Sequence, residues 1–219
     1  DTVNTLAVTT ASDTFDGDTS SIAALIASQG TDGRISLREA ITAANNTANA
    51  VGGADRIVFD IADPLVGGAH TITLAYDGPD PSNLPDALPT VTEAVVIDAT
   101  TDTDWAAAGG LPVIVLDGSA AAASADGLSI TAGNSTVRGL VIRNFGHFGV
   151  YLATGGGNTI EGNFIGTNAT GTAAAGNAWG IVLDNSANNV IGGTTAAARN
   201  LISGNASDGI NIGGAGSTG

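Results

Sequence analysis

The chain has 219 residues and a formal net charge of −15, with 6 basic residues that are all arginine and with no cysteine or methionine. This charge argues against nucleic acid, whose phosphates need cationic partners, and against an anionic membrane surface. No stretch reaches the about 18 apolar residues of a membrane span, so we expect no membrane insertion. Without cysteine, disulfide and thiol chemistry are excluded.

The first fifty residues predict one strand and two helices. Residues 3–10 alternate well enough for a strand, and Ser20 and Ser21 offer a serine cap for a short helix over 22–26. A stronger helix signal follows, because Ser36 and Glu39 have the spacing of a capping box and apolar residues recur on one face from Leu37 to Ala44. We expect this second helix to cover the first edge of a β-stack.

An acidic turn lies between the predicted strand and the first helix. Asp13, Asp16 and Asp18 flank Gly17, and oxygen ligands at nearly alternate positions around a glycine suit Ca²⁺. Asp32 is close enough in sequence to join them. The twelve-residue spacing of an EF-hand and its closing glutamate are missing, so a solvated acidic turn is the alternative to calcium.

From residue 56 onward, short apolar runs predict strands. The runs are 56–60, 71–74, 95–98, 113–117, 128–130 and 140–142. Gly-Val-Tyr-Leu at 149–152 then recurs as Gly-Ile-Val-Leu at 180–183 and as Gly-Ile-Asn-Ile at 209–212. Units this short cannot bury a face alone, but stacked units share a continuous core.

The repeat length predicts a right-handed parallel β-helix with three faces, an all-β solenoid. Without the inserted loops 167–177 and 194–199, about 20–24 residues and three strands make one coil. Asparagines one coil apart can then hydrogen-bond along the axis. The predicted pairs are Asn158 with Asn189 and Asn163 with Asn200.

Two segments carry a family resemblance. Thr31-Asp-Gly33, then Ser36-Leu-Arg-Glu-Ala-Ile41 and Ala43-Ala-Asn45, resemble the CSLREA-domain family, with Ile35 in place of its cysteine. Residues 163–171 and 200–205 resemble the right-handed β-helix repeats that usually follow that domain. The resemblance implies an extracellular module of a large bacterial secreted or surface protein, and it supplies no catalytic site.

Candidate chemistry is sparse. The weak catalytic candidates are Arg143, His147, Tyr151, Glu161 and Asp184, with Arg138 beside them. A polysaccharide lyase needs a basic residue and cations, and a glycoside hydrolase needs clustered carboxylates. The alternative interpretation is that these side chains decorate turns and outward strand positions. Trp105 and Trp179 are candidate sugar-stacking residues, or covers of loop edges.

These observations predict two regions: an N-terminal strand and helical cap over 1–55, and a β-helix over 56–219 with regular repeats from about 127. Because the chain starts without methionine and stops inside a repeat, we expect a fragment whose solenoid continues. The predicted function is a non-catalytic, secreted or cell-surface scaffold for adhesion or assembly. Its partner would be a polysaccharide, a cell-surface molecule or further copies in a filament or layer. A carbohydrate-active enzyme (lyase, hydrolase or epimerase) and a glycan-binding module remain the alternatives.

Overall fold

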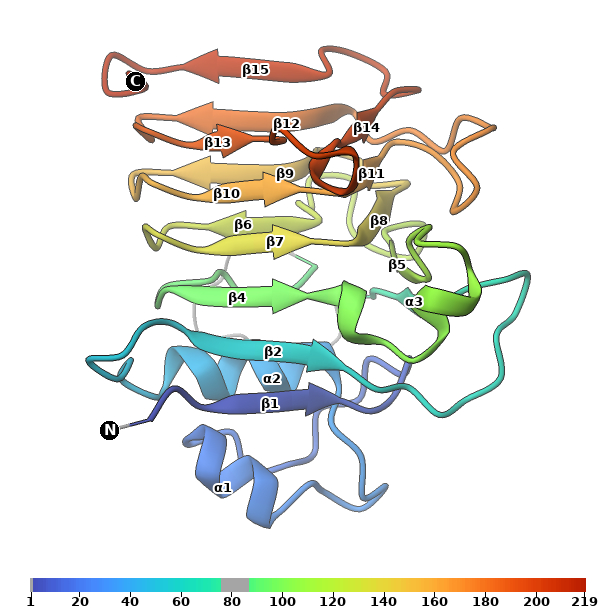
Figure 1. The fold of residues 1–219 in the computed structure, drawn as a ribbon, viewed down its shortest axis with the longest axis vertical. Helices are drawn as coiled ribbons and strands as arrows, with labels where there is room; N and C mark the ends of the chain where they lie inside the picture. Colours follow the sequence, from blue (N-terminus) through green and yellow to red (C-terminus); the bar gives the residue numbers. More distant parts are fainter. Residues whose placement is uncertain (1, 76–86) are drawn as a thin grey trace.

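The computed structural model describes residues 2–75 and 87–219, and its strands form three parallel sheets (Figure 1). The first sheet has, in spatial order, β1 (Thr5–Val8), β2 (Asp55–Phe59), β4 (Val95–Asp98), β7 (Thr136–Arg138), β10 (Thr159–Glu161) and β13 (Val190–Ile191). The second has β3 (His70–Thr73), β5 (Ile114–Asp117), β8 (Leu140–Arg143), β11 (Phe164–Ile165) and β14 (Leu201–Ile202). The third has β6 (Leu128–Ile130), β9 (Phe148–Ala153), β12 (Trp179–Asp184) and β15 (Ile210–Gly213).

The chain visits these sheets in rotation. It passes through β4, β5 and β6, one in each sheet, and then through β7, β8 and β9 one level further along the stack. Each strand inside a sheet therefore pairs in parallel with the strand one coil earlier and with the strand one coil later. This is the arrangement of a parallel β-helix, and the predicted strands lie within a few residues of the observed ones.

Aliphatic side chains stack in columns inside the coils. Ile57, Ile97, Val137 and Ile160 occupy one register of the first sheet, and all four are fully buried. The second and third sheets contribute similar columns of Ile, Leu and Val. The core is thus built from branched aliphatic residues, which explains why so few aromatic residues are needed.

Asparagines occupy the corners between sheets, as predicted. Asn158 donates its backbone N–H to Oδ1 of Asn189 at 3.0 Å, and Asn163 donates to Oδ1 of Asn200 at 2.9 Å. The third corner has a further pair that the sequence reading missed, because Asn177 ends an inserted loop and its N–H donates to Asn205 at 3.1 Å.

Two helices lie at the N-terminal end of the stack (Figure 1), α1 (Ile22–Ala27) and α2 (Leu37–Asn45). Ser21 caps α1, and Ser36 and Glu39 form the predicted capping box of α2. The buried apolar side chains of α2 belong to the same core as those of β1 and β2. The shorter helical turns are η1 (Ala99–Thr101), α3 (Asp104–Ala107) and η2 (Ala196–Ala198). No helix among the described residues has the length and apolar character needed to cross a membrane.

Candidate functional site

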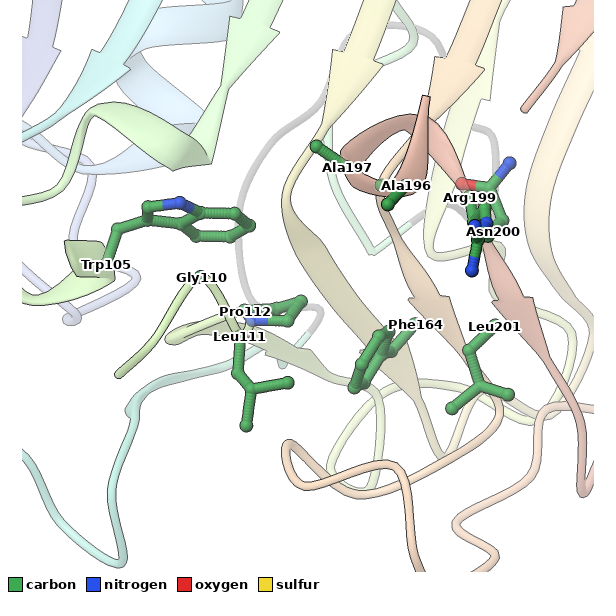
Figure 2. A pocket seen from close by; sticks show the side chains of 11 residues that line it. Trp105, Gly110, Leu111, Pro112, Phe164, Ala196, Ala197, Arg199, Asn200 and Leu201 are labelled. Carbon is green, nitrogen blue, oxygen red and sulfur yellow. The ribbon is translucent and has the colours of Figure 1, made fainter. Parts of the chain in front are cut away.

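Trp105 lines a surface pocket of about 370 Å³, which we call the Trp105 pocket (Figure 2). Its other lining residues are Gly110, Leu111, Pro112, Gly162, Phe164, Ala196, Ala197, Arg199, Asn200 and Leu201. The volume lies at the lower end of the roughly 300–1,000 Å³ range of ligand pockets. The two aromatic rings and the aliphatic side chains offer apolar surface, and Arg199 offers a cationic group.

Two short helical segments, α3 and η2, contribute residues to the walls of this pocket. Trp105 lies on α3, whose first N–H, that of Asp104, donates to Oδ1 of Asp102 at 3.0 Å. The Trp105 ring lies close over Gly139, which has a φ of +78° and no side chain to displace the ring. On the opposite side, Thr195 caps η2, and the short helix places Ala196 and Ala197 at the pocket. The insertion at 194–199 therefore builds one wall.

Arg199 has a distinctive electrostatic environment. Among the residues that the structure describes, it is the one arginine without an ion pair, and it is exposed. The other arginines are paired with Asp13, Asp63, Asp98 and Asp117. In a chain of net charge −15, the cation at the Trp105 pocket is thus available to an external anion or hydroxyl group.

The weak catalytic candidates lie on different sheets. Arg143 is on β8 of the second sheet, where it binds Asp117 at 2.8 Å. Glu161 is on β10 of the first sheet, 3.7 Å from Arg138. Arg138 also pairs with the buried carboxylate of Asp98. These charged side chains connect successive coils through ion pairs.

The remaining candidates gather at the third sheet, where an aromatic cluster forms. The rings of His147 and Phe148 stack at 3.5 Å, and Trp179 meets Phe148 edge-on at 6.4 Å. Tyr151 lies 5.2 Å from Phe148 and donates its hydroxyl to Asp184 at 3.2 Å. Trp179 is therefore part of a packed cluster, whereas Trp105 lines a pocket.

The histidine of this cluster is paired with a buried acid. His147 Nδ1 lies 2.7 Å from Oδ1 of Asp126. Burial raises the pKa of the Asp126 carboxyl above its ordinary value, although hydrogen bonds from Phe148 and His147 and the charge of His147 oppose the rise. The pair fixes the imidazole against the sheet.

The four aspartates expected to bind calcium each contact a different residue. Asp13 pairs with Arg38, and Asp16 accepts hydrogen bonds from the hydroxyl and the backbone of Thr31, which lower its pKa. Asp18 and Asp32 each accept the N–H of a residue two positions later. Calcium binding at this turn stays a prediction. Within the described residues, the side chains close enough to share a metal ion are those of His70, Asp102 and Asp104.

Trp105 is the one residue of the Trp105 pocket that the sequence analysis named as a candidate binding residue. Sequence reasoning named Trp105, and it also noticed the insertion at 194–199, but it did not connect the two. Phe164, Arg199 and Leu201 reach the pocket because the stacking of the coils aligns residues that are tens of positions apart. The insertion within a regular repeat was the available signal, because inserted loops on solenoids often form binding faces.

The three parallel sheets define this molecule as a β-solenoid protein. Residues 95–218 match the family model described as the right handed beta helix region, and the chain belongs to that family. No curated protein and no solved structure matches the chain significantly. The family match does not extend to residues 31–45, so the CSLREA resemblance of that segment stays a prediction.

Proposed function

We propose that this chain is a non-catalytic, secreted or cell-surface β-helix module that adheres to carbohydrate through the Trp105 pocket. The observation that carries the proposal is the combination of Trp105 and Phe164 with the unpaired Arg199 in one pocket. Aromatic faces provide apolar area for the C–H faces of sugar rings, and an arginine donates hydrogen bonds to hydroxyl or carboxylate oxygens.

Several features support a scaffold rather than an enzyme. The candidate catalytic groups are distributed over three sheets, and Arg143, His147 and Tyr151 each contact a carboxylate that already holds them in place. In addition, α1 and α2 lie at the N-terminal end of the stack and share its core, which supports their proposed role as a cap. The extracellular location rests on the resemblance of residues 31–45 to the CSLREA family.

The test is a binding screen followed by titration calorimetry with neutral and uronate-containing oligosaccharides. We expect binding by the wild-type protein, its loss in Trp105→Ala, and weakening in Arg199→Gln. Trp179→Ala is the matched control, because this second tryptophan lies on the third sheet away from the pocket. Equal binding by wild type and Trp105→Ala, or no binding to any glycan, would contradict the proposal.

A further inference from the structure

His70 faces two carboxylates at a point where successive coils meet. His70 begins β3, Asp102 directly follows η1, and Asp104 is the first residue of α3. The Nε2 atom of His70 is 3.2 Å from Oδ2 of Asp104 and 3.9 Å from Oδ1 of Asp102. One ligand atom from each residue lies within 4.8 Å of the other two. All three atoms thus surround one small volume.

Two of these side chains are withdrawn from solvent. The side chains of His70 and Asp102 are 1% and 0% exposed, and that of Asp104 is 36% exposed. The Asp102 carboxylate is fixed by two backbone donors, the N–H of Ile61 at 3.2 Å and the N–H of Asp104 at 3.0 Å. A metal site needs this kind of support for its ligands, together with an opening for an ion and water. The partly exposed Asp104 side chain marks the side from which an ion and water could reach the site.

The charges at this point are out of balance. Among the ion pairs that the described residues form, His70 is the only partner of Asp102 and of Asp104. A single imidazole, even when protonated, offsets one of the two carboxylates. The Asp102 carboxylate is buried, and a buried charge is costly unless it is paired or coordinates a metal. A divalent cation would neutralise both carboxylates.

The spacing also fits a metal ion. Bonds of about 2.0–2.2 Å from a cation to nitrogen and oxygen ligands place those ligand atoms about 3–4 Å apart. The two measured distances from Nε2, 3.2 and 3.9 Å, fall in this range. An imidazole ligand suits Zn²⁺ and neighbouring transition metals, whereas Ca²⁺ and Mg²⁺ prefer oxygen ligands alone. We propose that His70, Asp102 and Asp104 bind one first-row transition metal ion of the Zn²⁺ or Mn²⁺ type, with water completing its coordination.

The site would brace the turn that carries Trp105. Asp104 and Trp105 are adjacent in α3, and His70 belongs to another coil, so the ion would tie α3 to β3. This consequence does not depend on whether the Trp105 pocket binds sugar. Metal binding and carbohydrate binding can be measured separately, so failure of one leaves the other standing.

The experiment uses the full chain without a polyhistidine tag, stripped with a chelator and titrated with Zn²⁺, Mn²⁺ and Ca²⁺ by calorimetry. We expect one Zn²⁺ or Mn²⁺ ion per chain and retention of the ion, measured by elemental analysis, after gel filtration. His70→Gln should weaken binding by about 100-fold or more, because even loss of an outer-shell partner typically costs about 10- to 100-fold. His147→Gln is the matched control, since the chain has 2 histidines and His147 contacts a single carboxylate.

Asp104→Asn is the second variant, in case His70→Gln does not fold. Because the Asp104 side chain is partly exposed, this substitution should leave the fold intact. It should weaken Zn²⁺ binding while the melting temperature without metal stays close to that of the wild type. Absence of Zn²⁺ and Mn²⁺ binding by the wild-type chain would overturn the proposal. Binding that survives both His70→Gln and Asp104→Asn, or that is lost in His147→Gln, would overturn it equally.

Discussion

Glu39 holds the backbone of Gly17: its Oε1 accepts the Gly17 N–H at 2.7 Å, although the two residues are 22 positions apart. The same oxygen accepts the N–H of Asp16 at 2.8 Å, and Oε2 accepts the N–H of Ser36 at 2.9 Å. One buried carboxylate thereby caps α2 and fixes the acidic turn beside it. Within the Ser-Leu-Arg-Glu-Ala segment, Ser36 and Glu39 thus have structural roles.

Glu39→Gln should destabilise the fold. Every backbone group that Glu39 contacts is a donor, so the amide NH₂ of glutamine would face an N–H wherever it points. We expect a loss of about 1–3 kcal/mol in the free energy of unfolding, measured by urea denaturation. Glu93→Gln, at an exposed position, is the control and should stay close to wild type. Equal stability of the two variants would contradict this role.

Asn163→Ala should remove a corner bond between coils. The Asn163 Oδ1 accepts the N–H of Leu140 at 3.0 Å, and its Nδ2 donates to the carbonyl oxygens of Val137 and Glu161. Because Asn163 is fully buried, alanine leaves these groups without partners. We expect a cost of about 2–4 kcal/mol in urea denaturation.

The control for this variant is Asn211→Ala, because the Asn211 side chain donates to the exposed side chain of Asp208. Its free energy of unfolding should change by no more than about 0.5 kcal/mol. A cost for Asn163→Ala as small as that would show that the corner asparagines contribute little to stability.

The repeated sequence phrases predicted the strands and the corner asparagines. Contacts between segments far apart in the sequence were not predicted. The pairs Asn158–Asn189 and Asn163–Asn200 could be predicted because each asparagine lies two positions before an isoleucine in a repeated phrase. The Trp105 pocket could not be predicted, because its walls come from different coils and from an inserted loop whose path the sequence does not show. Nor did the spacing of the acidic turn show that Asp13 pairs with Arg38, which lies 25 positions away.

Asp98→Asn should reduce the dependence of stability on pH. Burial raises the pKa of Asp98, but hydrogen bonds from Arg138 and Thr100 and the charge of Arg138 outweigh it, so the pKa is lowered from 3.8. A carboxyl with a lowered pKa in the folded state stabilises the fold above its unfolded pKa, about 3.9, and this stability is lost as the pH falls through the folded value.

The wild type should therefore lose stability below about pH 4, and Asp98→Asn should lose less of it. At pH 7 the variant should be less stable by about 1–3 kcal/mol, because Arg56 and Arg138 lose their shared partner. The measurement is urea denaturation at pH 7 and pH 3. Asp208→Asn, at an exposed position, should keep the wild-type pH dependence. An unchanged dependence in Asp98→Asn would contradict the assignment.

Gly139→Ala should displace the Trp105 ring, which packs against the backbone of Gly139. A Cβ at this position would lie 2.8 Å from Cγ2 of Thr100 and 3.1 Å from Cζ3 of Trp105. Gly33→Ala is the matched control, because Gly33 also has a positive φ, +65°, but among the described residues no atom beyond its two chain neighbours lies within 4 Å of its Cβ position. We expect Gly33→Ala to cost about 1–2 kcal/mol from the backbone conformation alone.

Gly139→Ala should cost more than this, because Trp105 or Thr100 has to move in addition. In a Trp179→Phe background, the fluorescence then reports Trp105 alone, since the chain has 2 tryptophans. We expect Gly139→Ala to shift the emission of Trp105, and Gly33→Ala to leave it unchanged. Equal costs and identical spectra would mean that the ring does not depend on the bare backbone of Gly139. A shifted spectrum with weaker sugar binding would link the position of this ring to the function of the pocket.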